Sequence, residues 1–172
     1  MTGYTFEDDE INAFVTGAKG KTVFVTRGAL ENLGRDELLA IIAHELGHVK
    51  GRHMLRGYTF AILPIVPMAI VAKIGDRLPE MVLTICVVLS FVILVAGVLY
   101  RLARFNLKHE FEADEFAAKL VGADAMIRAL KKISEHGEIP EETPKLFNVI
   151  NAHPSIRERV ERLSALSRKE DV

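Results

Sequence analysis

Residues 81–100 form an unbroken run without a charged side chain, and this run limits the folds that the chain can adopt. A helix of this length spans about 30 Å, which is the thickness of the hydrocarbon core of a bilayer. A soluble domain of 172 residues would struggle to enclose a helix that is apolar on all sides. The run therefore predicts a membrane-spanning helix.

A second uncharged run, residues 57–72, precedes the first and contains two prolines. Transmembrane helices tolerate proline because neighbouring groups satisfy the backbone polar atoms that it leaves unpaired. Residues 75–80 between the two runs read as a polar turn. We predict an inserted two-helix membrane hairpin formed by residues 57–73 and 81–103. The alternative is a pair of buried helices in a soluble protein.

The remainder of the chain reads as a small, mostly helical domain. Residues 11–15 and 21–25 alternate between apolar and polar side chains and flank a glycine-containing loop, which predicts a β-hairpin. From Asp36 the apolar residues recur at helical spacing. A final helix is expected after Pro154, with an apolar stripe formed by Ile156, Val160 and Leu163. We expect a predominantly helical α+β fold and one domain over residues 1–172.

The charge balance argues against one class of partner. The chain has 22 basic and 23 acidic residues and a net charge of −1, which gives no reason to expect nucleic-acid binding. The sequence carries no signal of oligomeric state.

The segment His44-Glu45-Leu46-Gly47-His48 carries chemistry. His44 and His48 are four residues apart on a predicted helix, so both imidazoles project from one face and can bind a zinc ion. Glu45 can hold and deprotonate a zinc-bound water, whose pKa the metal lowers to about 7. The simpler alternative is two partly exposed histidines on an ordinary helix. A di-iron bundle would need a second Glu-x-x-His, which the chain lacks.

A catalytic zinc needs a third protein ligand and an open position. Glu110 and Asp114 are four residues apart and share a helical face, so Glu110 can be the ligand and Asp114 can accept a hydrogen bond from a ligand histidine. Glu112 would point elsewhere, and a solvated acidic face is the alternative. On a continuous helix His53 would face away from His44. We expect structural or surface roles for His53, His109 and His136.

These motifs, together with Asn12-Ala13-Phe14 and Ala152-His153-Pro154-Ser155, resemble the HtpX-type integral-membrane zinc peptidases. They are more distantly similar to the CAAX prenyl proteases of the same clan. The resemblance covers nearly the whole chain and implies a gluzincin-type domain with one zinc ion. It also implies that Glu110 is the third ligand and that Asp114 supports the site. Substrate would align along an edge strand formed by Asn12, Ala13 and Phe14.

The resemblance further implies that His153 faces the active-site cleft. A histidine before Pro154 could donate a hydrogen bond to the oxyanion of a tetrahedral intermediate. A purely structural role at a helix start is the alternative. Full-length HtpX proteins carry two membrane helices before the Asn12 strand, so we expect either a naturally short member or a piece of a longer chain.

The order of the motifs constrains membrane topology. His44 and His48 precede the apolar pair and Glu110 follows it, so the chain must cross the bilayer an even number of times between them. Basic residues gather on both outer flanks of the pair, which predicts a cytoplasmic site on a multi-pass protein of the cell membrane. These flanking residues are Lys50, Arg52, Arg56, Arg101, Arg104 and Lys108.

The predicted function is zinc-dependent endopeptidase action on membrane or misfolded proteins, in membrane protein quality control. The bilayer and protein or peptide substrates are the expected partners. One alternative is a narrow-specificity protease of the prenyl-protein type. A second is a non-hydrolytic sensor or binding module, which would have no need of Glu45 as a general base.

Overall fold

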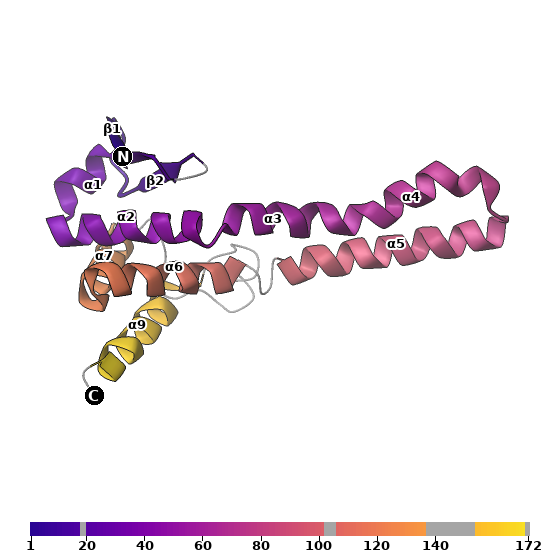
Figure 1. The fold of residues 1–172 in the computed structure, drawn as a ribbon. Coiled ribbons are helices and arrows are strands. Elements are labelled where there is room, and N and C mark those ends of the chain that lie inside the picture. Colours follow the sequence, from indigo (N-terminus) through magenta and orange to yellow (C-terminus); the bar gives the residue numbers. More distant parts are fainter. Residues whose placement is uncertain (18–19, 102–105, 137–153, 171–172) are drawn as a thin grey trace.

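The fold was analysed on a computed structural model that describes residues 1–17, 20–101, 106–136 and 154–170. Three short strands precede a series of helices (Figure 1). The strands are β1 (Thr2–Phe6), β2 (Ala13–Thr16) and β3 (Thr22–Thr26). The α-helices are α1 (Arg27–Asn32), α2 (Arg35–Lys50), α3 (His53–Ile62), α4 (Val66–Ile74), α5 (Glu80–Tyr100), α6 (Asn106–Val121), α7 (Ala123–Glu135) and α9 (Ile156–Glu170). Two 3₁₀ turns, η1 (Leu63–Ile65) and η2 (Gly75–Arg77), flank α4.

The sheet has the order β1-β3-β2, so β2 lies at one edge. β2 and β3 pair antiparallel, with Ala13 opposite Val25, and they form the expected hairpin. Gly17 and Gly20 at its turn have positive φ angles of 88° and 60°, which side chains disfavour. β1 pairs parallel with β3 and was not predicted.

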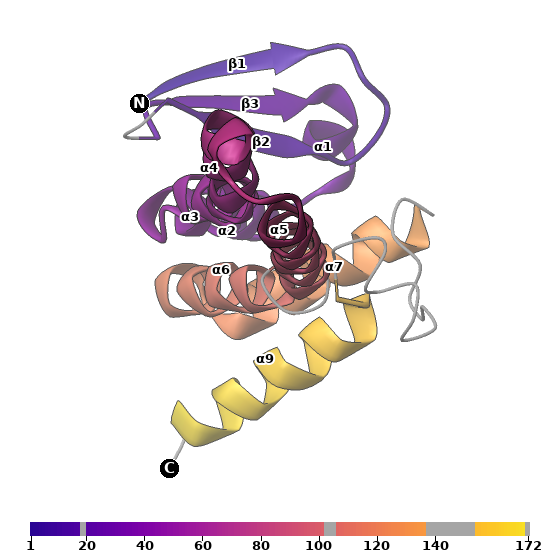
Figure 2. The ribbon, with the colours of Figure 1, turned by 90° about the vertical axis from the view of Figure 1, so that its right-hand side faces the viewer.

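Helix α2 is the central element of the globular part. In Figure 2 the sheet lies on one side of α2, and α6, α7 and α9 lie on the other. Ile41 belongs to the apolar core against the sheet, whereas Ala40 and Ala43 belong to the core shared with α6, α7 and α9. Because α2 packs against both cores, the histidine motif that it carries is held in place from both sides.

An apolar hairpin projects from this globular part (Figure 1). Its first arm runs through α3, η1 and α4, and α5 returns alongside that arm, where Pro64 packs against Gly97. Two helical segments, His53–Arg77 and Glu80–Tyr100, are long and apolar enough to cross a membrane, and few of their side chains are buried. The first arm begins four residues before the predicted 57–73, and the predicted 81–103 ends partly outside the described residues.

A backbone break separates α2 from α3. Arg52 has a φ of 51°, in the left-handed region, and α3 begins immediately after it at His53. The expectation that His53 lies on a different helical face from His44 assumed one continuous helix, which the structure does not have. The break turns His53 back, so that its Nδ1 lies 2.9 Å from Nδ1 of His48.

Candidate metal centre

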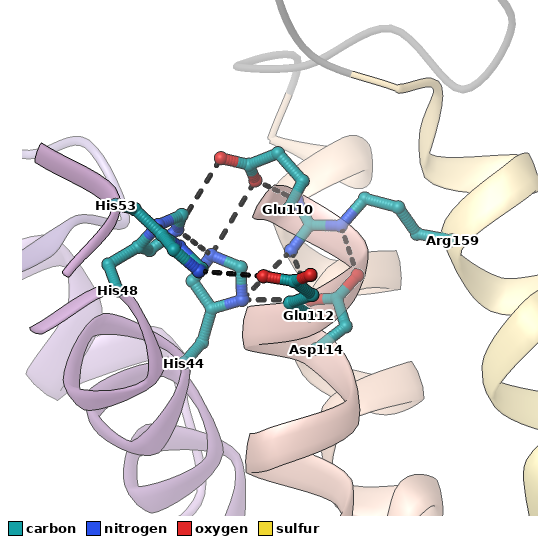
Figure 3. A network of polar contacts seen from close by, with 7 residues as sticks. All are labelled: His44, His48, His53, Glu110, Glu112, Asp114 and Arg159. Carbon is teal, nitrogen blue, oxygen red and sulfur yellow. Dashed lines mark hydrogen bonds and ion pairs between the residues drawn. The ribbon is translucent and has the colours of Figure 1, made fainter. Parts of the chain in front are cut away.

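Three side chains from two helices converge on one point (Figure 3). His44 and His48 lie one turn apart on α2, and their Nε2 atoms are 3.1 Å apart. Glu110 on α6 places Oε2 3.6 Å from Nε2 of His44 and Oε1 3.4 Å from Nε2 of His48. Ligand atoms in a tetrahedral zinc site with bonds of about 2.0–2.1 Å lie about 3.3 Å from one another. The donor set therefore fits a zinc ion with little adjustment.

Close packing of α2 on α6 brings the third donor within reach. Gly47 meets Ala113 where the helices cross, and a Cβ atom at Gly47 would lie 2.9 Å from the Ala113 Cα. Real side chains do not accept such a contact, so a larger residue would push the helices apart. The glycine of the histidine motif thus sets the separation between the histidine pair and Glu110.

A buried charge network lies behind the donors (Figure 3). Nδ1 of His44 is 2.8 Å from Oδ1 of Asp114. Arg159 on α9 donates two hydrogen bonds to that carboxylate, from Nε to Oδ2 at 2.7 Å and from Nη2 to Oδ1 at 2.6 Å. Both Asp114 and Arg159 are almost fully buried. The carboxylate fixes the ring of His44 with Nε2 directed at the convergence point.

Arg159 was missed in the sequence analysis, although the sequence holds a signal for it. It lies three residues after Ile156, next to Val160 and four before Leu163, which places it on the apolar stripe of its helix. A charged residue on a buried stripe needs a buried partner of opposite charge. Asp114 is that partner.

Glu45 lies in the same cleft, partly buried, one residue after His44. Burial disfavours its charged form and raises the pKa of its carboxyl group, and the neighbouring Glu110 adds to this. A carboxylate with a raised pKa is a stronger base than an exposed one.

The cleft has a volume of about 410 Å³ and runs from the donor cluster to the sheet edge. Asn12, which precedes β2, and Ala13, its first residue, line it. Phe14 does not line it, since its ring stacks on Phe24 with centroids 4.8 Å apart. Asn12 is held in place by Thr26, whose hydroxyl donates to the Asn12 carbonyl at 2.8 Å.

Residues 2–167 match the family described as Peptidase family M48. The chain belongs to this family. The predicted resemblance to HtpX-type peptidases is thereby confirmed, and so is the predominantly helical α+β fold with two long apolar helices.

Curated relatives of this M48 chain include Protease HtpX of Acinetobacter baylyi, 30% identical over 199 residues. Another is Protease HtpX of Pseudomonas fluorescens, 30% identical over 184 residues. The alignments cover 94% and 90% of this chain but only 64% and 61% of those proteins. The chain thus spans less than two thirds of the length of these relatives. The crystal structure of S. mikatae Ste24p has the same fold, with a TM-score of 0.72 at 18% identity over 94% of this chain and 44% of that one.

Of the predicted site residues in this M48 chain, the described structure brings together those of α2 and α6. His153 lies outside the described residues. Glu112 does not join the three donors but contacts His53, at 3.1 Å between Oε2 and Nε2.

The two histidines of the donor set have opposite pKa shifts. Burial lowers the pKa of His44, but hydrogen bonds to Asp114 and Glu110 outweigh it and raise the pKa to about 9. Burial, together with repulsion from His44, lowers the pKa of His48 to about 4. At pH 7 these values make His44 an imidazolium, hydrogen-bonded to two carboxylates, and His48 a neutral imidazole in the metal-free site.

Zinc binding at pH 7 is expected to release about one proton per ion, because a histidine must be neutral to bind a metal. His44 supplies this proton and His48 supplies none, given their pKa values of about 9 and about 4. Zinc affinity should rise by at least about tenfold per pH unit up to the pKa of His44. Calorimetric titrations in two buffers of different ionisation enthalpy count the proton. Binding at pH 7 without proton release would contradict the charge state assigned to His44.

Proposed function

We propose that the chain is a zinc-dependent endopeptidase that hydrolyses peptide bonds of membrane or misfolded proteins. The observation that carries this proposal is the convergence of His44, His48 and Glu110 beside Glu45, in a cleft bounded by a sheet edge. A zinc ion held by these three residues would lower the pKa of a bound water to about 7 and polarise the scissile carbonyl group.

The side chains of the cleft then have separate tasks. Glu45 accepts the proton of the attacking water and passes it to the leaving amine, the two transfers expected of one general base and acid. His153 is proposed to donate a hydrogen bond to the oxyanion. Asp114 holds His44 in the tautomer whose Nε2 faces the donor cluster.

The edge of β2 that no other described strand covers is proposed to bind the substrate. An extended peptide can add a strand to an exposed sheet edge through main-chain hydrogen bonds. Asn12 and Ala13 line the cleft beside Glu45 and His48, so a peptide paired with this edge would pass the donor cluster. Main-chain recognition of this kind suits a protease with many substrates.

We further propose that the hairpin of α3 to α5 crosses the cell membrane and that the site faces the cytoplasm. An exposed apolar surface of this extent is costly in water, because nearly all of its large side chains would be solvated. Basic residues lie at the base of the hairpin, among them Lys50 and Arg52 before it, Arg56 in the first turn of α3, and Lys108 after it. A site at the base of the hairpin would lie close to the membrane surface, where segments of other membrane proteins leave the bilayer. This position fits a role in membrane protein quality control.

Two other functions are compatible with the same fold. A narrow-specificity protease would use the same donors with a more selective cleft. A sensor or binding module would hold zinc without turnover, but it would not need Glu45 at the position of the general base, and the presence of Glu45 argues for hydrolysis.

Metal removal tests the proposal directly. The detergent-purified protein should cleave an unfolded casein-like substrate, lose this activity on treatment with a chelator, and regain it with one equivalent of zinc. Elemental analysis of the purified protein gives the stoichiometry, expected to be one ion per chain. Hydrolysis that continues in metal-free protein would refute the mechanism, and tight zinc binding without hydrolysis of any peptide would favour the binding module.

A further inference from the structure

A second set of polar contacts begins at the metal ligand His48 (Figure 3). Nδ1 of His48 lies 2.9 Å from Nδ1 of His53, the first residue of α3. Nε2 of His53 lies 3.1 Å from Oε2 of Glu112 on α6. His53 is buried, with 6% of its surface exposed, whereas Glu112 reaches the solvent. The contacts therefore run from a donor of the metal site through a buried imidazole to a surface carboxylate.

The proton positions along this chain follow from the site. If Nε2 of His48 binds zinc, that atom carries no proton, so Nδ1 of the same neutral ring does. His53 must then accept at Nδ1, which leaves the proton of its neutral ring on Nε2. That N–H donates to the carboxylate of Glu112, an acceptor. Each hydrogen bond has one donor and one acceptor in this arrangement.

We propose that His53 and Glu112 are positioning residues for the zinc ligand His48. This inference rests on the proposed zinc site. His53 fixes the tautomer and the ring orientation of His48, and the negative charge of Glu112 holds the proton of His53 on the far nitrogen. The two ligand histidines are thus supported differently: His44 contacts a carboxylate directly, whereas His48 contacts one through a second imidazole.

The same cluster could instead be read as a second metal site, since His53, His109 and Glu112 bring donor atoms within 4.8 Å of one another. The rings of His53 and His109 stack with centroids 3.9 Å apart and an interplanar angle of 3°. Lone pairs of imidazole lie in the ring plane, so parallel stacked rings do not direct them at one ion. Arg56 and Lys108 both lie 3.6 Å from Glu112 oxygens and oppose a further cation. His53 also has no free lone pair while it accepts from His48.

The place of His53 in the fold links the metal ligand to the hairpin. The break at Arg52 ends α2 and lets α3 start with His53 against the ring of His48. Glu112 lies on α6, the helix that also carries Glu110. The two positioning residues thus connect the metal ligand to the first helix of the hairpin, α3, and to the helix that follows the hairpin in sequence, α6.

The zinc affinity of the full chain in detergent, measured by competition with a chromophoric chelator, tests the proposal. His53→Phe keeps a ring that stacks on His109 but cannot accept a hydrogen bond, and it should weaken zinc binding by about 10–100-fold. His53→Asn places an amide oxygen at the depth of Nδ1 and should restore most of the affinity. Rescue by an acceptor would not be expected if His53 only filled space.

Glu112→Gln tests the outer member of the chain with minimal disturbance of packing, and it should weaken zinc binding less than His53→Phe does. Glu115→Gln, the matched change on the same helix, should leave affinity unchanged, since Glu115 pairs with Lys119 on the surface. Circular dichroism of the metal-free variants reports folding separately.

Unchanged affinity in both His53→Phe and Glu112→Gln would overturn the proposal. So would a stoichiometry of two zinc ions per chain that falls to one in His53→Phe. Because affinity is read without turnover, an inactive protein that shows the expected series would refute only the proposed hydrolysis.

Discussion

Replacing Glu45 with Gln is expected to lower peptide hydrolysis by about 10²–10⁴-fold while zinc stays bound. Gln is nearly isosteric but cannot take a proton from the attacking water. Glu45 lies in the cleft beside the three donors without joining them, so the donor set remains complete in the variant. The loss should therefore fall on kcat, with the zinc stoichiometry and the unfolding temperature close to those of the parent protein.

The matched control for this change is Asp36→Asn on the same helix. Asp36 is exposed in the first turn of α2, away from the cleft, and its neutralisation should leave kcat unchanged. Steady-state kinetics on a quenched fluorescent peptide, with zinc content measured on the same samples, separates chemistry from metal loss. Retained hydrolysis in Glu45→Gln with zinc bound would remove Glu45 from the proposed mechanism.

The local pattern carried most of the information about the donors. His44 and His48 are neighbours on any helix that contains them, and the spacing of Glu110 and Asp114 places both on one face of α6. The apolar runs between the motifs predicted the hairpin because helix length and hydropathy depend on consecutive residues. These features needed no knowledge of how the helices pack.

Features that depend on chain reversal or on long-range packing were not predicted. β1 joins the sheet by pairing with a strand twenty residues later in the sequence, and its five residues carry no strong periodic signal. The contact of His53 with His48 was not predicted, because one left-handed residue, Arg52, redirects the chain. Arg159 meets Asp114 across 45 positions, so only its place on a buried stripe hinted at a partner.

Breaking the buried ion pair of Arg159 and Asp114 is expected to have a large effect on stability. Arg159→Leu should destabilise the metal-free protein by about 3–5 kcal/mol, because it removes the guanidinium partner of the buried Asp114 carboxylate and leaves only His44 beside it. The side chains are 6% and 3% exposed, so solvent cannot replace the lost interaction. Denaturant unfolding in a mild detergent, followed by circular dichroism, measures the change. Arg157→Leu on the exposed side of the same helix is the control and should change stability little.

The pH dependence of the stability lost in Arg159→Leu identifies the cause of the loss. Burial would raise the pKa of Asp114, but Arg159 outweighs burial and holds that pKa below its usual value. The stability from this pair is therefore present above the pKa of Asp114 in the unfolded chain, about 3.9, and is lost as the pH falls through its lower value in the folded protein. In Arg159→Leu the guanidinium no longer lowers the pKa of Asp114, although His44 still does. The pKa of Asp114 in the folded variant is therefore less depressed, and the variant loses less stability on acidification than the parent does. The difference between the two proteins should thus shrink as the pH falls. A deficit that stays constant between neutral and acidic pH would instead assign the effect to lost packing around the guanidinium group.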